Sequence, residues 1–501
     1  MSNLDFSELG PCDDSSSSSS VRLADLFPEA TRTGTEDVVF SSCVCDWREV
    51  QPGDVYVALP DTAGDEGDGH LHAQRAVSCG AIAVVCEQPV PVFDVPTYLV
   101  PDTRVALGEI SHALMGHPSR SLEVIGVAGT HGKSTTIALL EAIFSAAGRH
   151  CGVLSSLGSY DGMTHSAGIS DLPSSPAIAC RLARMEAAGC THAFVEVSSQ
   201  SLSQARWTGV ELDAICITNV TSAHLDLHNT VKGYRDTERR VMSQLSPSGL
   251  VALNADDPVS MSWLDQVSGP VLTYGLGGAA EVTARLVESH ANGQTFILTA
   301  GSDSVAVNTS MVGEHQIANC LAAATVALSY GIELTQIATG LESVEKLSAR
   351  MELVDCGQGF PLYVDAADTV DSLRASLRTA HQLAQGRVVC VWTDSGHASV
   401  AERLAVSQVL SRMADLAIVS QPLVRYLDDD QHHADVEVVA DRSEAIACAI
   451  GIAEPGDVVV IAGSRVRPSY QFGGEADFDT DAEIARQMLY AREVPALRLV
   501  S

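Results

Sequence analysis

Residues 126–136 read Gly126-Val-Ala-Gly129-Thr-His-Gly132-Lys133-Ser134-Thr135-Thr136, between an apolar segment at 122–127 and a helix-forming segment at 137–147. A strand, a glycine-bearing turn with a lysine and then a helix form a cradle for phosphate. Backbone N–H groups at the helix start face the anion, the lysine adds positive charge, and a hydroxyl can reach a metal ion. Counted from Gly126, the lysine comes one position later than in GxxxxGK[ST], which predicts a variant P-loop. The alternative is a strand–turn–helix corner without a ligand, which explains the lysine and the hydroxyls poorly.

The composition is strongly acidic. The 501 residues include 63 Asp and Glu against 30 Lys and Arg, giving a net charge of −33. This charge argues against nucleic acid or an anionic membrane as a partner, so an anionic nucleotide needs locally placed positive groups. The absence of a membrane-spanning apolar run and of a basic-then-apolar leader predicts a cytoplasmic protein without membrane insertion. The 13 scattered cysteines are expected to be reduced and mostly buried.

The pattern of apolar and polar segments divides the chain into an arm and three α/β domains. Residues 1–20, which include six consecutive serines, are predicted to be a disordered arm. Short apolar strands predict a small N-terminal α/β domain at 21–118. Alternating strands and helices at 119–345 predict a parallel sheet with helices on both faces, with an antiparallel appendage at 282–309. A second alternation at 346–501 predicts a doubly wound, Rossmann-like domain.

Two further groups of polar side chains follow predicted strands. Glu196 lies at the carboxyl end of an apolar strand, where α/β sheets place ligands, and a carboxylate there suits Mg²⁺. The alternative is a carboxylate that caps the next helix. His224, Asp226 and His228 follow another strand at spacings of two residues. That spacing is compatible with a metal site and equally with a helix cap.

These motifs occur with others in a fixed order. Asp46-Trp47-Arg48, followed by Pro52-Gly53-Asp54, is similar to a DSR-x-V-x-PGD motif, and Glu196-Val-Ser198-Ser199 with Gln204 and Arg206 is similar to E-V-S-S-H-x-L-x-Q-x-R. Residues 254–257 and 350–352 fit the NADD and GRME signatures. The set resembles the Mur ligase family, the ATP-dependent amide-bond ligases of peptidoglycan precursor synthesis, and within it the branch that adds the third amino acid. The resemblance covers nearly the whole chain from Val21.

The resemblance implies a reaction and a set of roles. With ATP and Mg²⁺, the D-glutamate carboxylate of UDP-MurNAc-L-Ala-D-Glu attacks the γ-phosphate, and the amine of an amino acid such as diaminopimelate or lysine then attacks the acyl-phosphate. The implied catalytic residues are Lys133, Glu196, His224 and Glu238, and the implied metal ligands are Ser134, Glu196 and His224. The implied nucleotide contacts are Gly129, Thr130, His131, Gly132, Lys133, Ser134, Thr135, Asn319 and Arg350. The implied substrate contacts are Asp46, Trp47, Arg48, Ser198, Gln204, Arg206, Arg425 and Arg467. A monomer with a substrate-binding N-terminal domain, an ATP-binding central domain and an acceptor-binding C-terminal domain is expected.

The sequence departs from the family pattern at several of these positions. Glu238 stands where the family places a carbamylated lysine that bridges to the metal, and a glutamate reaches about 3–4 Å less far. Trp47 replaces the serine expected at the uridine end. In the third domain, Pro422-Leu423-Val424-Arg425 keeps only the arginine of D-N-P-R, and Gly463-Ser464-Arg465-Val466-Arg467 replaces G-K-G-H-E. The two new arginines could bind a carboxylate or could be exposed charges.

Three hypotheses therefore remain open. The chain is a tripeptide synthetase with a rebuilt acceptor site, a paralogue that ligates a different acceptor, or a non-catalytic relative that binds nucleotide in a regulatory role. The retained Ser198, Gln204 and Arg206 favour the first hypothesis. The family's carbamylated lysine is replaced by Glu238, and both the D-N-P-R and the G-K-G-H-E motifs are altered. Together these changes favour the third hypothesis.

Overall fold

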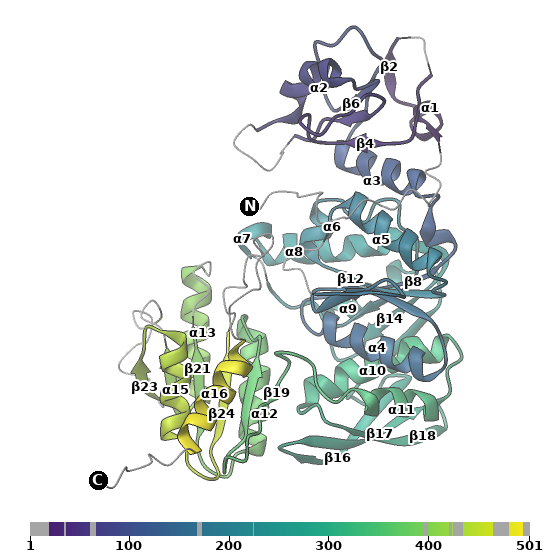
Figure 1. The fold of residues 1–501 in the computed structure, drawn as a ribbon. Coiled ribbons are helices and arrows are strands. Elements are labelled where there is room, and N and C mark those ends of the chain that lie inside the picture. The colour runs from purple at the N-terminus through teal and green to yellow at the C-terminus, as the bar shows by residue number, and fades with distance from the viewer. Residues whose placement is uncertain are drawn as a thin grey trace.

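The computed structural model describes residues 20–34, 37–60, 67–167, 173–223, 225–393, 399–419, 423, 434–463 and 480–493. These residues form three α/β lobes (Figure 1), with the N-terminal lobe stacked on the central lobe and the C-terminal lobe beside it. Within the described ranges, no helix has the length and apolar character needed to cross a membrane. The structure confirms the predicted architecture of three α/β domains.

The N-terminal lobe is built on a five-stranded sheet in the order β2-β7-β6-β5-β4. β4, β5, β6 and β7 run parallel, and β2 pairs antiparallel with β7. The short strands β5 and β6 are fully buried, as their unbroken apolar sequences predict. The elements of this lobe are β1 (Val21–Arg22), α1 (Leu23–Leu26), β2 (Thr31–Thr33), β3 (Val39–Phe40), β4 (Cys43–Val44), β5 (Val55–Val57), α2 (Ala73–Cys79), β6 (Ala83–Cys86), β7 (Thr97–Leu99) and α3 (Thr103–Leu114).

The central lobe contains an eleven-stranded sheet in the order β11-β10-β9-β12-β8-β13-β14-β15-β16-β17-β18. Its strands are β8 (Glu123–Ala128), β9 (Cys151–Ser155), β10 (Gly158–Tyr160), β11 (His165–Ala167), β12 (His192–Val197), β13 (Leu212–Ile217), β14 (Leu245–Asn254), β15 (Val271–Gly275), β16 (Val282–His290), β17 (Gly293–Ala300) and β18 (Asp303–Thr309). The strands from β9 to β16 run parallel, whereas both ends of the sheet are antiparallel. The segment 282–309 is therefore antiparallel as predicted, but it continues the main sheet instead of forming a separate appendage, because β16 pairs with β15.

Helices cover both faces of the parallel part. One core joins the sheet to α4 (Lys133–Ala146), α10 (Glu314–Ser329) and α11 (Leu334–Ser343). Alanines 322, 323, 324 and 327 of α10 are fully buried, so this helix packs closely, as its composition predicts. A second core on the opposite face includes α5 (Ser175–Ala187). The shorter helices are α6 (Ser199–Ser203), α7 (Leu225–His228), α8 (Val231–Glu238) and α9 (Pro258–Met261).

The C-terminal lobe is doubly wound, as predicted. Its sheet has the order β19-β20-β24-β21-β22-β23 and is parallel apart from β19. The strands are β19 (Glu352–Leu353), β20 (Leu362–Asp365), β21 (Val388–Trp392), β22 (Leu416–Val419), β23 (Asp435–Val438) and β24 (Val458–Ala462). Helices α12 (Val370–Leu383) and α13 (Val400–Met413) cover one face, and α15 (Arg442–Ile452) and α16 (Asp481–Glu493) cover the other. The sequence prediction lacked β19, β23, α15 and α16.

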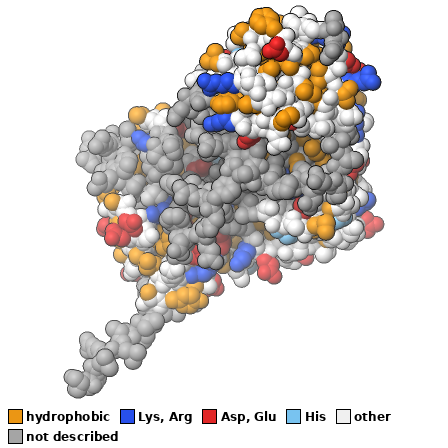
Figure 2. Space-filling model, turned by 45° about the horizontal axis from the view of Figure 1, so that its top comes forward, with side chains coloured by type: hydrophobic (Ala, Val, Ile, Leu, Met, Phe, Trp, Pro, Cys, Tyr) orange, Lys and Arg blue, Asp and Glu red, His pale blue; other side chains and the backbone are white. Residues whose placement is uncertain are grey.

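The described cysteines are all free, and most of them are buried, in agreement with the expectation of reduced thiols. Figure 2 shows one face of the molecule, on which the described Lys and Arg side chains lie scattered among acidic and neutral ones.

Candidate active site

The predicted phosphate loop lies at the carboxyl edge of the central sheet. β9, β12, β8 and β13 are consecutive neighbours and run parallel, so their carboxyl ends meet at one edge. The loop that follows β8 leads directly into α4. Gly126 lies within β8 and not in the turn, so the turn glycines are Gly129 and Gly132. The prediction that counted the motif from Gly126 was wrong in this detail.

Both turn glycines have a backbone that other residues rarely adopt. The φ angles are +123° for Gly129 and +85° for Gly132. A Cβ on Gly132 would collide with Oδ1 of Asn319, and a Cβ on Gly129 would lie 2.6 Å from the carbonyl oxygen of Asn219. Only glycine fits at these two positions. The close approach also brings α10, through Asn319, against the loop.

Asn219 fixes the shape of the loop from the end of β13. Its carbonyl oxygen accepts a hydrogen bond from the N–H of Thr130 at 2.7 Å. Its side chain accepts from the N–H of His131 at 3.1 Å and donates to the carbonyl oxygen of the same residue at 3.1 Å. One residue thus holds three successive peptide units of the loop.

Lys133 and Ser134 begin α4 at this edge. The Lys133 ammonium donates to the carbonyl oxygens of Gly129 and Thr130, at 2.7 and 3.0 Å. The Ser134 hydroxyl donates to Oε2 of Glu196 at 2.9 Å and lies 2.9 Å from the hydroxyl of Ser156. The same carboxylate oxygen accepts from the N–H of Ser156 at 2.8 Å. The structure therefore brings the loop cation, the loop hydroxyl and the strand-end carboxylate together.

Glu238 faces the same loop from the end of α8. Its side chain is 1 % exposed, and Oε1 lies 2.9 Å from the Tyr234 hydroxyl, which also lies 2.8 Å from Oγ1 of Thr130. No described residue forms a hydrogen bond with Oε2 of Glu238. Burial raises the pKa of this carboxyl above its ordinary value of 4.5, against the opposing effect of the nearby Lys133 ammonium. The shorter glutamate thus still reaches the loop, and it keeps one oxygen available.

The raised pKa of Glu238 makes the free protein less stable at neutral pH. Above the ordinary value of 4.5, the unfolded chain releases this proton before the folded chain does, so the free energy of unfolding falls as the pH rises towards the folded-state pKa. Glu238→Gln removes the buried charge and keeps an acceptor for Tyr234. We expect this variant to melt at a higher temperature than the wild type at pH 8, with a smaller difference at pH 5. Thermal melts at both pH values check this, and an equal difference at both would contradict it.

The predicted muramoyl-peptide contacts of the central lobe follow β12 on the same edge as Glu196. The Ser198 hydroxyl caps α6 by accepting a hydrogen bond from the N–H of Ser201. The Ser201 hydroxyl in turn accepts a hydrogen bond from Nε1 of Trp207. Arg206 donates to Oε1 of Gln204 at 2.7 Å. Gln204 and Arg206 therefore form one hydrogen-bonded pair just after α6.

The predicted contacts of the N-terminal lobe form a separate group between β4 and β5. Arg48 binds both carboxylate oxygens of Asp46, the shortest bond measuring 2.6 Å. The Arg75 guanidinium lies 5.1 Å from the centre of the Trp47 ring, and the His72 ring centre lies 5.9 Å from it. The structure places this group in a different lobe from the phosphate loop (Figure 1).

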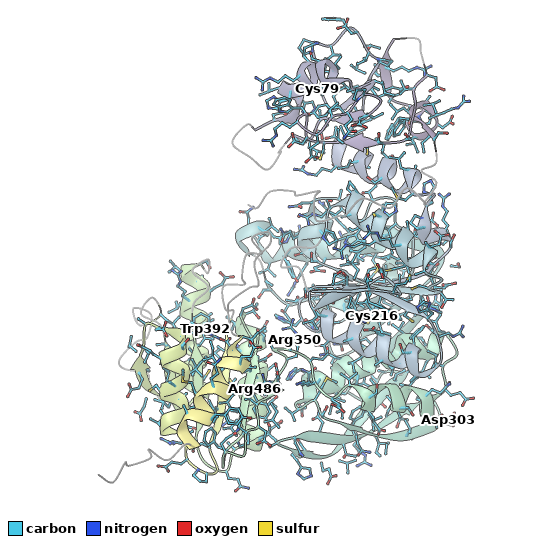
Figure 3. All side chains as sticks on the ribbon, in the orientation of Figure 1. Cys79, Cys216, Asp303, Arg350, Trp392 and Arg486 are labelled. Atoms are coloured by element: carbon cyan, nitrogen blue, oxygen red, sulfur yellow. The ribbon has the colours of Figure 1, made fainter. Side chains whose placement is uncertain are left out.

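A contact between His131 and Thr369 connects the loop region with the C-terminal lobe. Nε2 of His131 lies 3.2 Å from Oγ1 of Thr369, the N-cap residue of α12. Arg350 lies in the segment between α11 and β19, at the junction of the two lobes (Figure 3), and donates to the carbonyl oxygen of Ala349 at 3.1 Å. Ala349 and Met351 on either side have φ angles of +51° and +49°, a strained conformation for residues with a side chain.

Three predicted site residues, His224, Arg425 and Arg467, lie outside the described residues, as does Arg465. Thr135 is described and almost completely buried behind the loop. Within the part of the chain that the structure describes, no three His, Cys, Asp or Glu side chains gather as a preformed metal site. Ser134 and Glu196 are therefore the described residues on which the metal prediction rests.

Sequence reasoning missed Tyr234 and Ser156 as parts of the site. Tyr234 lies one helical turn before Glu238, so a helix assignment there would have placed both on one face. Ser156 directly follows β9, which ends at the same sheet edge as β8 and β12. Recognising 151–155 as a neighbouring parallel strand would have identified it.

A glycine loop with a lysine at the edge of a parallel sheet, next to a doubly wound lobe, defines a multidomain nucleotide-binding protein of the P-loop type. Residues 127–327 match the Mur ligase middle domain, and residues 349–465 match the Mur ligase glutamate ligase domain. The chain belongs to the Mur ligase family, whose members are ATP-dependent ligases.

Relatives match along almost the whole chain. The UDP-N-acetylmuramoyl-L-alanyl-D-glutamate–2,6-diaminopimelate ligase of Geobacillus thermodenitrificans is 34% identical over 480 residues, covering 92% of this chain and 96% of that protein. The UDP-N-acetylmuramyl-tripeptide synthetase of Roseiflexus sp. is 32% identical over 483 residues, covering 89% and 94%. These relatives correspond to the branch that the motifs indicate.

Solved structures share the fold. A UDP-N-acetylmuramoyl-L-alanyl-D-glutamate–2,6-diaminopimelate ligase superposes with a TM-score of 0.67 at 22% identity, covering 95% of this chain and 99% of that one. The MurF ligase of Thermotoga maritima, in complex with ADP, superposes with a TM-score of 0.63 at 17% identity, covering 90% and 97%. The three-lobed architecture is therefore that of the family.

Proposed function

We propose that this protein is an ATP-dependent ligase that joins an amino acid, with diaminopimelate the first candidate, to UDP-MurNAc-L-Ala-D-Glu in peptidoglycan precursor synthesis. The observation that carries the proposal is the hydrogen bond between Ser134 of the phosphate loop and Glu196, together with Lys133 one residue earlier. These are the groups that phosphoryl transfer needs at one place. Relatives at 34% and 32% identity carry names for this reaction.

The loop suits the phosphates of ATP. Because Gly129 and Gly132 lack side chains, the backbone N–H groups of the loop can approach the anion closely. Lys133 would exchange its two bonds to loop carbonyls for contacts with the β- and γ-phosphates, adding positive charge where negative charge develops. Asn219 holds the loop in place, so it needs little rearrangement.

The oxygen atoms around the loop also suit Mg²⁺. The Ser134 hydroxyl and the Glu196 carboxylate are the hard oxygen ligands that this ion prefers, and they already lie 2.9 Å apart. Oε2 of Glu238 has no hydrogen-bond partner among the described residues and could accept from a metal-bound water. Bound Mg²⁺ would neutralise charge on the transferring phosphoryl group. His224 remains a predicted ligand.

The remaining predicted contacts complete the proposal. Ser198, Gln204 and Arg206 would hold the peptide end of the UDP-substrate, and Asp46, Trp47 and Arg48 its uridine end. Arg350 and Asn319 would contact the nucleotide. The acceptor amino acid would bind to the C-terminal lobe, with Arg425 and Arg467 as predicted contacts. A monomer and a cytoplasmic location remain predictions.

The test is phosphate release by the purified protein with Mg²⁺-ATP, UDP-MurNAc-L-Ala-D-Glu and a panel of amino acids. We expect release that requires both the UDP-dipeptide and one amino acid. Phosphate release only with an acyl acceptor other than an amino acid would favour a paralogue that makes another product. Retained ATP binding without release in any combination would contradict the proposal in favour of a non-catalytic role.

A further inference from the structure

Tyr234 is a buried tyrosine whose hydroxyl contacts two residues of the site. It lies on α8, is 1 % exposed and belongs to the same apolar core as α5. Burying a hydroxyl costs free energy unless the group is hydrogen-bonded, and a phenylalanine would fill the same space without that cost. The partners of the hydroxyl are therefore the reason why a tyrosine suits this position.

The hydroxyl joins α8 to the phosphate loop. Its oxygen lies 2.8 Å from Oγ1 of Thr130 in the loop and 2.9 Å from Oε1 of Glu238, one helical turn later on α8. Oγ1 of Thr130 also accepts from the N–H of Thr221 at 3.0 Å, in the segment that follows β13. Three segments that are distant along the chain are therefore joined through this hydroxyl.

The number of protons sets the direction of these bonds. A phenol carries one proton and an ionised carboxylate only accepts, so Tyr234 donates to Glu238, and the Thr130 hydroxyl has a proton of its own for the other bond. Burial, together with the nearby carboxylate, raises the pKa of Tyr234 well above its ordinary value, so the phenol keeps its proton at neutral pH. Among the described residues, Tyr234 is the side chain that donates to Glu238.

A bond to Oε1 also fixes the other oxygen of the Glu238 carboxylate. Both oxygens are attached to one carbon, so a hydrogen bond that holds Oε1 sets the direction in which Oε2 points. Oε2 is buried without a hydrogen-bond partner among the described residues, and the carboxyl lies close enough to the Lys133 ammonium for that charge to oppose the rise of its pKa. The available oxygen is thus kept beside the phosphate loop.

The ring of Tyr234 is held as well as its hydroxyl. It packs edge-on against His228, with the ring centres 5.4 Å apart. Nε2 of His228 in turn lies 3.0 Å from the hydroxyl of Ser199, the first residue of α6. Helices α6 and α8 lie beside each other at the same end of the central lobe (Figure 1). A ring packed in this way has little freedom to turn away from Glu238.

A second buried tyrosine of the same lobe has partners of another kind. Tyr274, on β15, is also 1 % exposed, and its hydroxyl donates to the carbonyl oxygens of Ile217 and Thr218, at 2.8 and 3.3 Å. These bonds tie β15 to the end of β13 through backbone atoms. Tyr274 therefore matches Tyr234 in burial and in having a bonded hydroxyl, but its bonds do not go to Glu238 or Thr130.

We propose that Tyr234 is a positioning residue of the site around the phosphate loop. Its hydroxyl holds the Glu238 carboxylate so that Oε2 faces the loop, where this oxygen would accept from a water bound to Mg²⁺. Tyr234 acts through Glu238 and not by contact with a substrate. The proposal rests on the proposed ligase function and adds to it a residue that the motifs of the sequence did not indicate.

The test compares Tyr234→Phe with Tyr274→Phe in the full-length protein, by calorimetric titration with ATP in Mg²⁺ and in EDTA. For Tyr234→Phe we expect the gain in ATP affinity that Mg²⁺ provides to shrink about tenfold, and kcat to fall about 10- to 100-fold, the range lost when the partner of a metal-site group is removed. The affinity for ATP in EDTA should stay unchanged, because the loop keeps its bonds with Asn219. Tyr274→Phe should lower the melting temperature and leave the Mg²⁺ response and kcat unchanged.

A double variant tests whether Tyr234 acts through Glu238. Glu238→Gln removes the carboxylate that Tyr234 holds, so adding Tyr234→Phe to it should lower kcat and the Mg²⁺ response by a further factor of about two at most. Losses that multiply in the double variant, or a Glu238→Gln protein with the Mg²⁺ response of the wild type, would overturn the inference.

The binding measurement needs no turnover, so the inference and the proposed function can fail separately. Equal Mg²⁺ responses in Tyr234→Phe, Tyr274→Phe and the wild type would overturn the inference alone. A wild type that binds Mg²⁺-ATP but releases no phosphate with any amino acid would overturn the proposed function, and the titrations would still decide whether Tyr234 positions Glu238.

Discussion

Lys133→Ala is expected to lower kcat by about 10³-fold, the upper end of what is lost when one preorganised charge-stabilising donor is removed. Lys133 is the cation of the phosphate loop, and its ammonium lies within 2.7 and 3.0 Å of two loop carbonyls. In a chain with a net charge of −33, an anionic nucleotide depends on locally placed positive groups, and Lys133 is the one within the loop. Steady-state phosphate release with saturating substrates measures the effect.

The loss in Lys133→Ala should come from chemistry and not from unfolding. The loop keeps the hydrogen bonds that Asn219 makes with Thr130 and His131, so the melting temperature should change little. Lys232→Ala is the matched control, since Lys232 is an exposed lysine on α8 in the same lobe. Comparable losses in both variants would contradict the role assigned to Lys133.

Glu196→Gln is expected to be the second most damaging substitution. The amide oxygen can still accept from Ser134 and from the N–H of Ser156, so the fold should persist. The negative charge that suits Mg²⁺ is lost, however. We expect kcat/KM for ATP to fall about 10²- to 10³-fold and the half-saturating Mg²⁺ concentration to rise about tenfold or more.

A Mg²⁺ titration of phosphate release distinguishes the metal role of Glu196 from a cap of the next helix. The structure already disfavours the cap, because Ser198 is the residue that caps α6. Glu186→Gln, at an exposed glutamate of α5, serves as the control for charge removal. An unchanged Mg²⁺ requirement in Glu196→Gln would refute the metal role.

The sequence predicted the edge of the central sheet well because local patterns determine it. The apolar strand before Gly129, the lysine after Gly132 and the carboxylate at the end of β12 each follow from one short segment. Parallel strands then place these segments together without further information. The same reasoning failed for Gly126. This glycine lies in β8 and packs against Leu212 and Val197, but a sequence motif does not distinguish a glycine in a strand from a glycine in a turn.

The remaining parts of the site depend on contacts between distant segments. Asn219 contacts the loop 88 residues away along the chain, and His131 contacts Thr369 across 238 residues. Neither the hydrophobic periodicity of the sequence nor the spacing within its motifs can predict contacts between such distant residues.

The central claim is that this site joins an amino acid to a carboxylate through phosphorylation by ATP. The most direct measurement labels the D-glutamate carboxylate of UDP-MurNAc-L-Ala-D-Glu with oxygen-18 and follows phosphate and product by mass spectrometry. The attacking carboxylate oxygen leaves with the phosphate when the amine displaces it, so one labelled oxygen should appear in each phosphate, alongside a UDP-MurNAc-tripeptide. Unlabelled phosphate, or labelled substrate that remains intact while ATP is consumed, would contradict the account.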